Sequence, residues 1–211
     1  TLVVFTNVAT SGYKKHLFTN GSLTNLPKGM IISENGDLRF SEDGNTILFG
    51  IRPQEKKVKM SKDTVPNVDV WHWKDEYIQS VQMRRAEQNK KFTFLCSIDL
   101  TTGQFSKLAD EALRQILISR NSTYAIGRDE KPYINDVNWG VSPADLYRIN
   151  LKDGSRQLLA KEVKRPLGYS PDGRYYLYQL DSNLHVADLT TAKIVTVSAK
   201  APVRFMNLEH P

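Results

Sequence analysis

The sequence predicts an all-β protein that forms part of a β-propeller, with about four four-stranded blades. Three observations lead to this prediction: a strand–turn–strand unit that recurs along the chain, a hairpin unit that follows each copy, and strands that are nearly all apolar. A strand covered on both faces loses the alternation of polar and apolar residues. Small sheets stacked face to face in a propeller have such strands, because no blade can bury both of its faces alone.

The first recurring unit is a strand, a tight turn and a second strand. It reads FSEDGNTILF over 40–49 and YSPDGRYYLY over 169–178, and a worn copy one residue shorter lies at 118–126. In the second copy, Pro171 presets φ for a turn, and Gly173 can take the left-handed conformation that closes it. The aromatic and β-branched residues after these turns favour strands.

The second recurring unit is an outer hairpin with a short polar turn. It reads IDLTTGQF over 98–105 and INLKDGSR over 149–156, and a worn copy, ADLTTAKI, lies at 187–194. The worn copy has Ala192 in place of the turn glycine. Each repeat therefore has four strands and a period of about 40 to 50 residues apart from one insertion, which is typical of propeller blades.

We interpret residues 1–211 as one propeller segment. The blades are expected at about 1–30, 31–112, 113–163 and 164–201, with the start of a further blade at 202–211. The strands expected in the three complete blades are 37–40, 45–52, 92–99 and 104–108; 115–119, 123–128, 145–151 and 155–160; and 166–169, 174–180, 184–189 and 193–197. Both ends of the pattern are incomplete, so we expect that the chain does not close a ring by itself.

Composition excludes several classes of protein. Hydrophobic residues make up 40% and charged residues 25%, as in ordinary soluble domains, and no apolar run approaches the roughly 20 residues of a membrane span. The net charge of +6 arises mainly from the one segment 56–91 rather than from a stripe of basic residues interleaved with aromatics, which favours a solvated face over a nucleic-acid interface. Cys96 is the only cysteine, so an internal disulfide and a thiolate metal cluster are excluded, and we expect it to be a small buried residue.

The long insertion, residues 54–91 in the second blade, is where function could lie, since insertions of this kind leave a propeller at one end. The alternation in Val68–Trp73 predicts a strand, and Asp75–Asn89 has the composition of a helix. One interpretation is a lid or docking element that binds substrate or a partner. The other is that the tryptophans pack the insertion onto the blade. The sequence favours packing, although one of the two tryptophans could be exposed. The candidate binding residues are Trp71, Trp73, Arg84 and Arg85.

A shorter insertion, residues 129–143 in the third blade, carries Tyr133 and Trp139. These aromatic residues could line the mouth of a channel, and packing of the loop is the alternative that we favour.

The sequence contains no complete catalytic site. The serines at 142 and 170 each lack the second glycine of the G-x-S-x-G nucleophile turn, and we expect Ser170 to be structural. The histidines His16, His72, His185 and His210 lack metal-ligand spacing, and we expect no metal. No phosphate-binding loop or dinucleotide fingerprint occurs, so we expect no cofactor.

The turns of the first unit resemble the repeats of TolB-like propellers. Together with the segment PNVDVWHWKD at 66–75, the turn at 40–44 resembles the N-terminal propeller of exported bacterial proteins in the prolyl oligopeptidase family of serine peptidases. The resemblance covers most of the chain, but only as part of that propeller. It implies an α/β-hydrolase domain in the same parent chain, which would hold the catalytic residues, and an exported protein of the periplasm or a secreted one. No residue here matches the catalytic motifs.

The resemblance therefore implies a non-catalytic propeller that restricts and orients the peptide substrates of a serine peptidase. The alternative is a scaffold propeller of the TolB or WD-repeat kind, which binds protein partners and has no peptidase attached. The coding sequence of the parent discriminates between them, because the first hypothesis requires G-x-S-x-G followed by Asp and His downstream.

Overall fold

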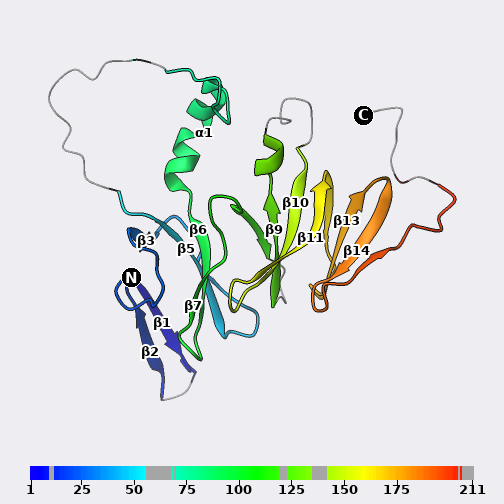
Figure 1. Cartoon of the computed structure of the whole chain (residues 1–211). Helices are drawn as coiled ribbons and strands as arrows, with labels where there is room; N and C mark the ends of the chain where they lie inside the picture. Colours follow the sequence, from blue (N-terminus) through cyan, green and yellow to red (C-terminus); the bar gives the residue numbers. More distant parts are fainter. Residues whose placement is uncertain are drawn as a thin grey trace. The chain divides into compact units, whose positions relative to one another are not determined.

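The chain divides into two compact units in this computed structural model (Figure 1). One unit comprises Thr1–Gly36 and Gly50–Thr93, and the other comprises Asp37–Phe49 and Phe94–Pro211. The structure describes residues 1–9, 12–55, 68, 70–118, 123–134, 142–203 and 205.

The first unit contains a two-stranded antiparallel hairpin, β1 (Leu2–Thr6) and β2 (Lys14–Phe18). A short strand, β3 (Met30–Ile32), pairs with the last residues of β5 (Thr46–Pro53). β3 is not among the strands expected from the sequence. The helix α1 (Gln79–Lys91) follows in the long insertion.

In the second unit, the first sheet is formed by consecutive antiparallel strands. β4 (Arg39–Phe40) pairs with the beginning of β5, and the order continues through β6 (Phe94–Asp99) to β7 (Phe105–Lys107). The burial of Thr46–Gly50 is continuous, with no alternation, as expected for a strand covered on both faces.

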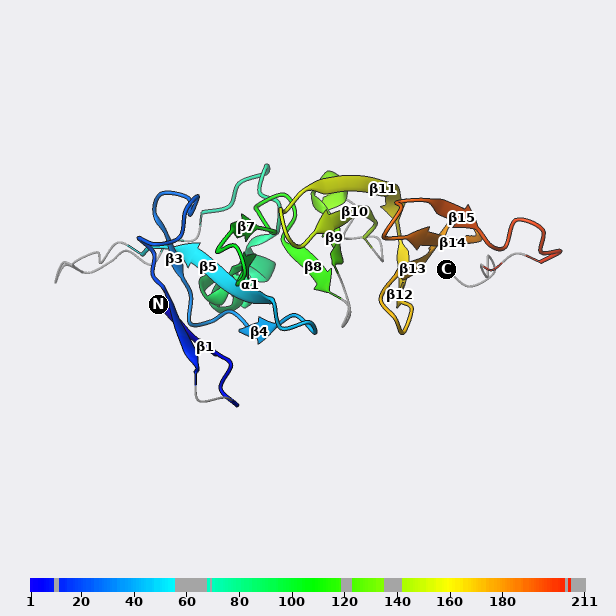
Figure 2. The same cartoon turned by 90° about the horizontal axis from the view of Figure 1, so that it is seen from below.

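The two sheets that follow repeat this plan. One has the order β8 (Gln115–Ile118), β9 (Tyr124–Asp129), β10 (Ala144–Asn150) and β11 (Arg156–Val163). The other has the order β12 (Arg165–Tyr169), β13 (Tyr175–Leu180), β14 (Asn183–Asp188) and β15 (Ile194–Thr196). Figure 2 shows them as two separate sheets. The chain is therefore an all-β partial propeller, and these strands lie close to those expected from the repeats.

The two Ser-x-Asp-Gly turns have the same hydrogen-bonded geometry. The Ser41 hydroxyl accepts the Thr46 N–H at 2.9 Å, and the Ser170 hydroxyl accepts the Tyr175 N–H at 2.9 Å. The turn glycines have φ of 68° and 70°, which only glycine adopts without strain. Ser170 is thus a turn residue, as expected. The corresponding turn of the third copy, at 119–122, lies outside the described residues.

The outer hairpins also share one turn conformation. Gly103 and Gly154 have φ of 73° and 72°, and Ala192 has φ of 59° at the matching position. The Asp188 carboxylate accepts the N–H groups of Thr190 and Thr191 at 2.8 and 3.2 Å, and Asp99 holds the first of these turns in the same way. A side chain at the start of the turn therefore fixes the backbone, and the loss of glycine at 192 leaves the turn intact.

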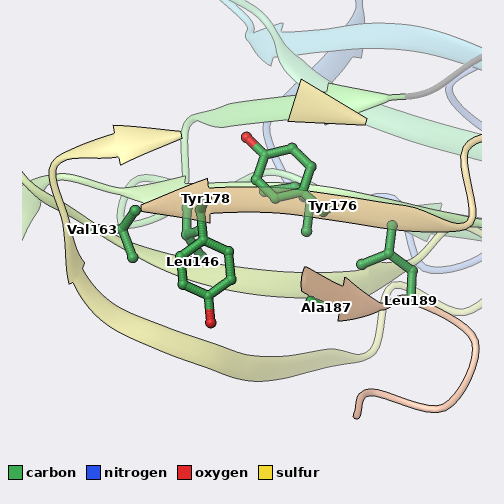
Figure 3. Packing of buried hydrophobic residues seen from close by; sticks show 7 residues of the cluster. Leu146, Val163, Tyr176, Tyr178, Ala187 and Leu189 are labelled. Carbon is green, nitrogen blue, oxygen red and sulfur yellow. The ribbon is translucent and has the colours of Figure 1, made fainter. Parts of the chain in front are cut away.

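Two apolar clusters join the three sheets of the second unit. Leu48, Leu108, Leu113, Ala125, Ile149 and Leu151 form the cluster between the first and second sheets. The cluster between the second and third contains Ile126, Leu146, Val163, Tyr176, Tyr178, Ala187 and Leu189 (Figure 3). Burying apolar side chains contributes about 1.5–3 kcal/mol each, so face-to-face stacking supplies most of the stability of this unit.

Hydrogen bonds fix the sheets in register across these clusters. The Ser97 hydroxyl donates to the Leu151 carbonyl at 2.7 Å, and the Arg156 guanidinium donates to the Asp110 carboxylate at 2.6 Å. Between the second and third sheets, the Tyr169 hydroxyl accepts the Ile126 N–H at 2.8 Å and donates to the Leu117 carbonyl. Ile126 and Leu117 are direct partners on neighbouring strands, so the tyrosine hydroxyl bridges two strands of the adjacent sheet.

The ion pair of Arg174 and Asp188, 2.9 Å between Nη2 and Oδ2, predicts a pH dependence of stability. The hydrogen bond from Arg174 lowers the pKa of Asp188 from 3.8 to about 2. Because the folded-state pKa is below the unfolded value, this stabilisation is present above pH 3.8 and is lost as the pH falls toward 2. Between pH 5 and about pH 2, the melting temperature should fall more steeply for the wild type than for Asp188→Asn. Parallel curves would contradict this assignment.

Candidate functional site

The long insertion departs from the sequence prediction in its first part. Val70–His72 has no strand conformation, whereas a strand was expected over Val68–Trp73. The Asp75 N–H donates to the His72 carbonyl at 3.0 Å and closes a turn instead. The expected helix is present, but it begins at Gln79 rather than at Asp75, so Tyr77 and Ile78 precede it.

Both candidate tryptophans are exposed, so the expectation that they pack the insertion onto the blade is wrong. Trp71 is 71% exposed and Trp73 is 86% exposed. The helix α1 has no buried residue either, and it therefore offers the two indoles no core. A helix of this length with no apolar face is marginal by itself.

The exposed aromatic loop is nevertheless held by hydrogen bonds. The Gln82 amide on α1 donates to the Tyr77 carbonyl at 2.7 Å and to the Asp75 carboxylate at 3.2 Å. The Lys74 N–H donates to His72 Nδ1 at 3.1 Å, and the His72 ring stacks on Trp73 with 6.2 Å between centroids. The loop is thus attached to the first turn of the helix while its side chains remain in solvent.

Trp71 and Trp73 line the same hollow. It has a volume of about 310 Å³ and is formed by Trp71, His72, Trp73, Asp75, Tyr77, Ile78 and Gln79. Two cations lie on its aromatic rings: Lys74 Nζ is 4.9 Å from the Trp73 centroid, and Arg85 Cζ is 4.3 Å from the Tyr77 centroid. Such contacts contribute about 0.5–1 kcal/mol at exposed positions.

The structure brings together three of the four predicted residues. Trp71 and Trp73 share the hollow, and Arg85 reaches it through Tyr77. Arg84 is exposed on α1 and does not line this hollow. Lys74 and Gln82 were not among the residues predicted from the sequence, because a cation–π contact and a helix-to-loop hydrogen bond leave no periodic signal.

Tyr133 fastens the described part of the shorter insertion to the sheet. The Tyr133 hydroxyl donates to Asp145 Oδ1 at 2.6 Å, and the same oxygen accepts the Glu162 N–H at 3.0 Å. This hydrogen bond raises the pKa of Tyr133 to about 12. Tyr133 therefore has a packing role, as favoured, and Trp139 lies outside the described residues.

Cys96 and His185 are held by packing and hydrogen bonds within the sheets. Cys96 is buried as expected, and burial raises the pKa of its thiol to about 12. His185 stacks on Tyr178 with 5.3 Å between centroids, and its Nδ1 lies 3.1 Å from the Thr196 hydroxyl. Among the described residues, no group of three or more His, Cys, Asp or Glu side chains could hold a metal ion. No described helix is long and apolar enough to cross a membrane.

A second hollow, in the second unit, is lined by a turn of the repeat. Its volume is about 390 Å³, and its lining includes Ser41, Asp43, Thr123 and Lys152. The Asp43 carboxylate accepts hydrogen bonds from Ser41 and from the Asn45 N–H, which lower its pKa. The polar groups of Ser41 and Asp43 are thus engaged in the hydrogen bonds of the blade turn. We therefore interpret this hollow as a feature of the repeated turn.

No protein-family model and no curated protein matches the sequence. Solved structures that are similar to it include TolB from Acinetobacter baumannii, at 14% identity and a TM-score of 0.33, over 81% of this chain and 33% of that one. An oligogalacturonate lyase in complex with manganese is 13% identical, with a TM-score of 0.40, over 81% of this chain and 42% of that one.

A prolyl endopeptidase is also similar, at 13% identity and a TM-score of 0.36, over 88% of this chain and 24% of that one. The chain thus spans between 24% and 42% of the length of these three structures.

Proposed function

We propose that this chain is the non-catalytic propeller portion of a larger serine peptidase of the prolyl oligopeptidase type, which restricts and orients peptide substrates. In this proposal, residues 1–211 are one propeller segment, with blades at about 1–30, 31–112, 113–163 and 164–201, a further blade starting at 202–211, and the insertion at 54–91. The partner is an α/β-hydrolase domain of the same parent chain, and the parent is exported to the periplasm or secreted.

The observation that carries the proposal is the pairing of the repeated Ser-x-Asp-Gly blade turns with an insertion of the form VDVWHWKD at 68–75. Stacked blades give a rigid body that can limit access to an adjoining site. The insertion adds a solvent-exposed aromatic element, of the residue types that dominate binding energy at interfaces.

The exposure of Trp71 and Trp73 also favours the second candidate, a scaffold propeller that binds a protein partner without any peptidase. Both candidates place the binding at the insertion. They differ in whether a hydrolase domain belongs to the same chain.

The test combines the gene with an assay of the whole protein. The reading frame that contains this chain should also encode G-x-S-x-G followed by Asp and His, and the purified parent should cleave short peptides. We expect kcat/KM to fall by about tenfold or more between a short peptide and an unfolded protein with the same cleavage site. A reading frame without these motifs, or a rate indifferent to substrate length, would reject the peptidase proposal and leave the scaffold.

A further inference from the structure

We infer that the exposed face of the third sheet, β12–β15, is the docking surface for a further four-stranded blade of the parent chain, and that an aromatic side chain of that blade fills a hollow beside Leu177. The inference rests on the proposed function in taking the parent to contain further blades. It goes further by naming the docking surface and the type of residue that anchors it. The docking surface belongs to the second unit alone.

The burial of β13 shows that one face of the third sheet is uncovered. Its sequence, YYLYQL, is nearly all apolar, which is typical of a strand covered on both faces. Tyr176 and Tyr178 are buried against the second sheet, whereas Tyr175 and Leu177, which alternate with them, are only half-buried. The corresponding strand of the first sheet, β5, is buried without such alternation. The composition of β13 therefore suits a second covering sheet.

Leu177 corresponds to two residues that a following sheet already covers. In each blade, the residue after the third strand donates its N–H to the carbonyl of the residue before the second strand, from Leu100 to Asn45, from Leu151 to Thr123 and from Leu189 to Arg174. Three residues after these acceptors lie Leu48, Ile126 and Leu177. Leu48 is buried between the first and second sheets, and Ile126 is buried between the second and third. Leu177 is thus the position that a further sheet would cover.

A hollow of about 380 Å³ lies beside Leu177, and its lining includes Leu167 and Gly168. The pair of Gly168 and Leu177 on neighbouring strands corresponds to the pair of Leu117 and Ile126 in the second sheet. There, Tyr169 of the following sheet fills the place, since its hydroxyl contacts the backbone of both paired residues. Tyr169 directly precedes the blade turn. We therefore expect the aromatic residue before the turn of a further blade to fill the hollow beside Leu177.

The docking surface beyond the hollow is apolar. Leu177 pairs with Val186, and Val186 pairs with Val195, so the three side chains share one face, where Val195 is 58% exposed. The residues that correspond to Val186 in the first two sheets are Ser97 and Arg148, and each donates a hydrogen bond to a backbone carbonyl of the following sheet. Because valine cannot donate, the further blade should present an apolar surface here rather than an unpaired carbonyl.

The test measures the alkylation of introduced cysteines in the parent protein, followed by mass spectrometry at each site. Leu167→Cys places a thiol at a 53% exposed position of the hollow, and Thr190→Cys is the matched control at the exposed outer turn of the same sheet. If a further blade fills the hollow, the Leu167→Cys variant should react with iodoacetamide at least about tenfold more slowly than the Thr190→Cys variant. Cys96 is buried and should stay unmodified in both.

A second substitution identifies the anchor. Replacing the aromatic residue that precedes the next blade turn of the parent by Ala should remove most of the difference between the two cysteine variants, because it reopens the hollow. Equal rates in the two variants, no effect of this replacement, or a parent without such an aromatic residue would overturn the inference. Protection that is lost on about hundredfold dilution would also overturn it, since cover by a second copy depends on concentration and cover by the same chain does not.

The result is independent of peptidase activity. A protected hollow in a parent without hydrolase motifs would leave the docking surface standing and reject the proposed peptidase. Length-dependent cleavage by a parent whose hollow is open to iodoacetamide would leave the proposed function standing and reject the docking surface.

Discussion

Leu146→Ala should lower the free energy of unfolding by about 3 kcal/mol, because the loss of buried methyl groups leaves a cavity between two sheets. Leu146 lies on β10, is fully buried, and belongs to the same cluster as Tyr176 and Tyr178 of the third sheet (Figure 3). Rigid neighbouring strands on both sides give the site little freedom to collapse. Urea denaturation followed by circular dichroism would measure the change.

The matched control for that substitution is Leu158→Ala on the neighbouring strand β11. Leu158 is 40% exposed, so its truncation should cost less than about 1 kcal/mol. If the two variants lost equal stability, the second and third sheets would not be stacked through Leu146.

Tyr169→Phe should lower the free energy of unfolding by about 2 kcal/mol, although it removes only one oxygen. The hydroxyl satisfies the Ile126 N–H and the Leu117 carbonyl at once, and an unsatisfied buried backbone group costs about 1–3 kcal/mol. Partial closure of β8 onto β9 would recover some of this loss. Burial also raises the pKa of Tyr169, so the hydroxyl remains protonated and able to donate at neutral pH.

Tyr176→Phe is the control for the tyrosine variant, because its ring is buried in the same cluster while its hydroxyl has no hydrogen bond in the described part of the chain. It should change stability by less than about 0.5 kcal/mol in either direction. Amide hydrogen exchange at Ile126 gives a second measurement: the protection of this amide should fall in Tyr169→Phe and remain in Tyr176→Phe. Unchanged protection in Tyr169→Phe would show that the hydroxyl does not bridge the strands.

The blades could be predicted from the sequence because their signals are local and repeated. The Ser-x-Asp-Gly turn needs a hydroxyl, a carboxylate and a glycine at fixed spacing, and the structure uses all three at Ser41–Gly44 and again at Ser170–Gly173. Continuous apolar runs after these turns indicated strands covered on both faces, and β5 is buried in this way. β3 escaped prediction, since three residues that pair with the end of β5 carry no period.

The insertion was predicted less well because its conformation depends on what surrounds it. Alternation in Val68–Trp73 would indicate a strand only if a partner strand lay beside it, and the described residues provide a turn at His72–Asp75 instead. The tryptophans were expected to pack because tryptophan side chains are highly buried on average in folded proteins. Both are exposed in the structure, and no described core lies against them. The binding role of Arg85 stays a prediction, and its position on the Tyr77 ring depends on a contact between loop and helix that leaves no signal in the sequence.

The left-handed backbone at Ala192 has a consequence for how the outermost strand behaves. A residue with a β-carbon in this conformation costs about 1–2 kcal/mol, and β15 has only three residues with which to offset it. The strained turn and the short strand lie at the same edge of the last sheet. We therefore expect this edge of the last sheet to fray before the opposite edge, β12, on warming, which would leave β14 unpaired on one side while the inner strands remain intact.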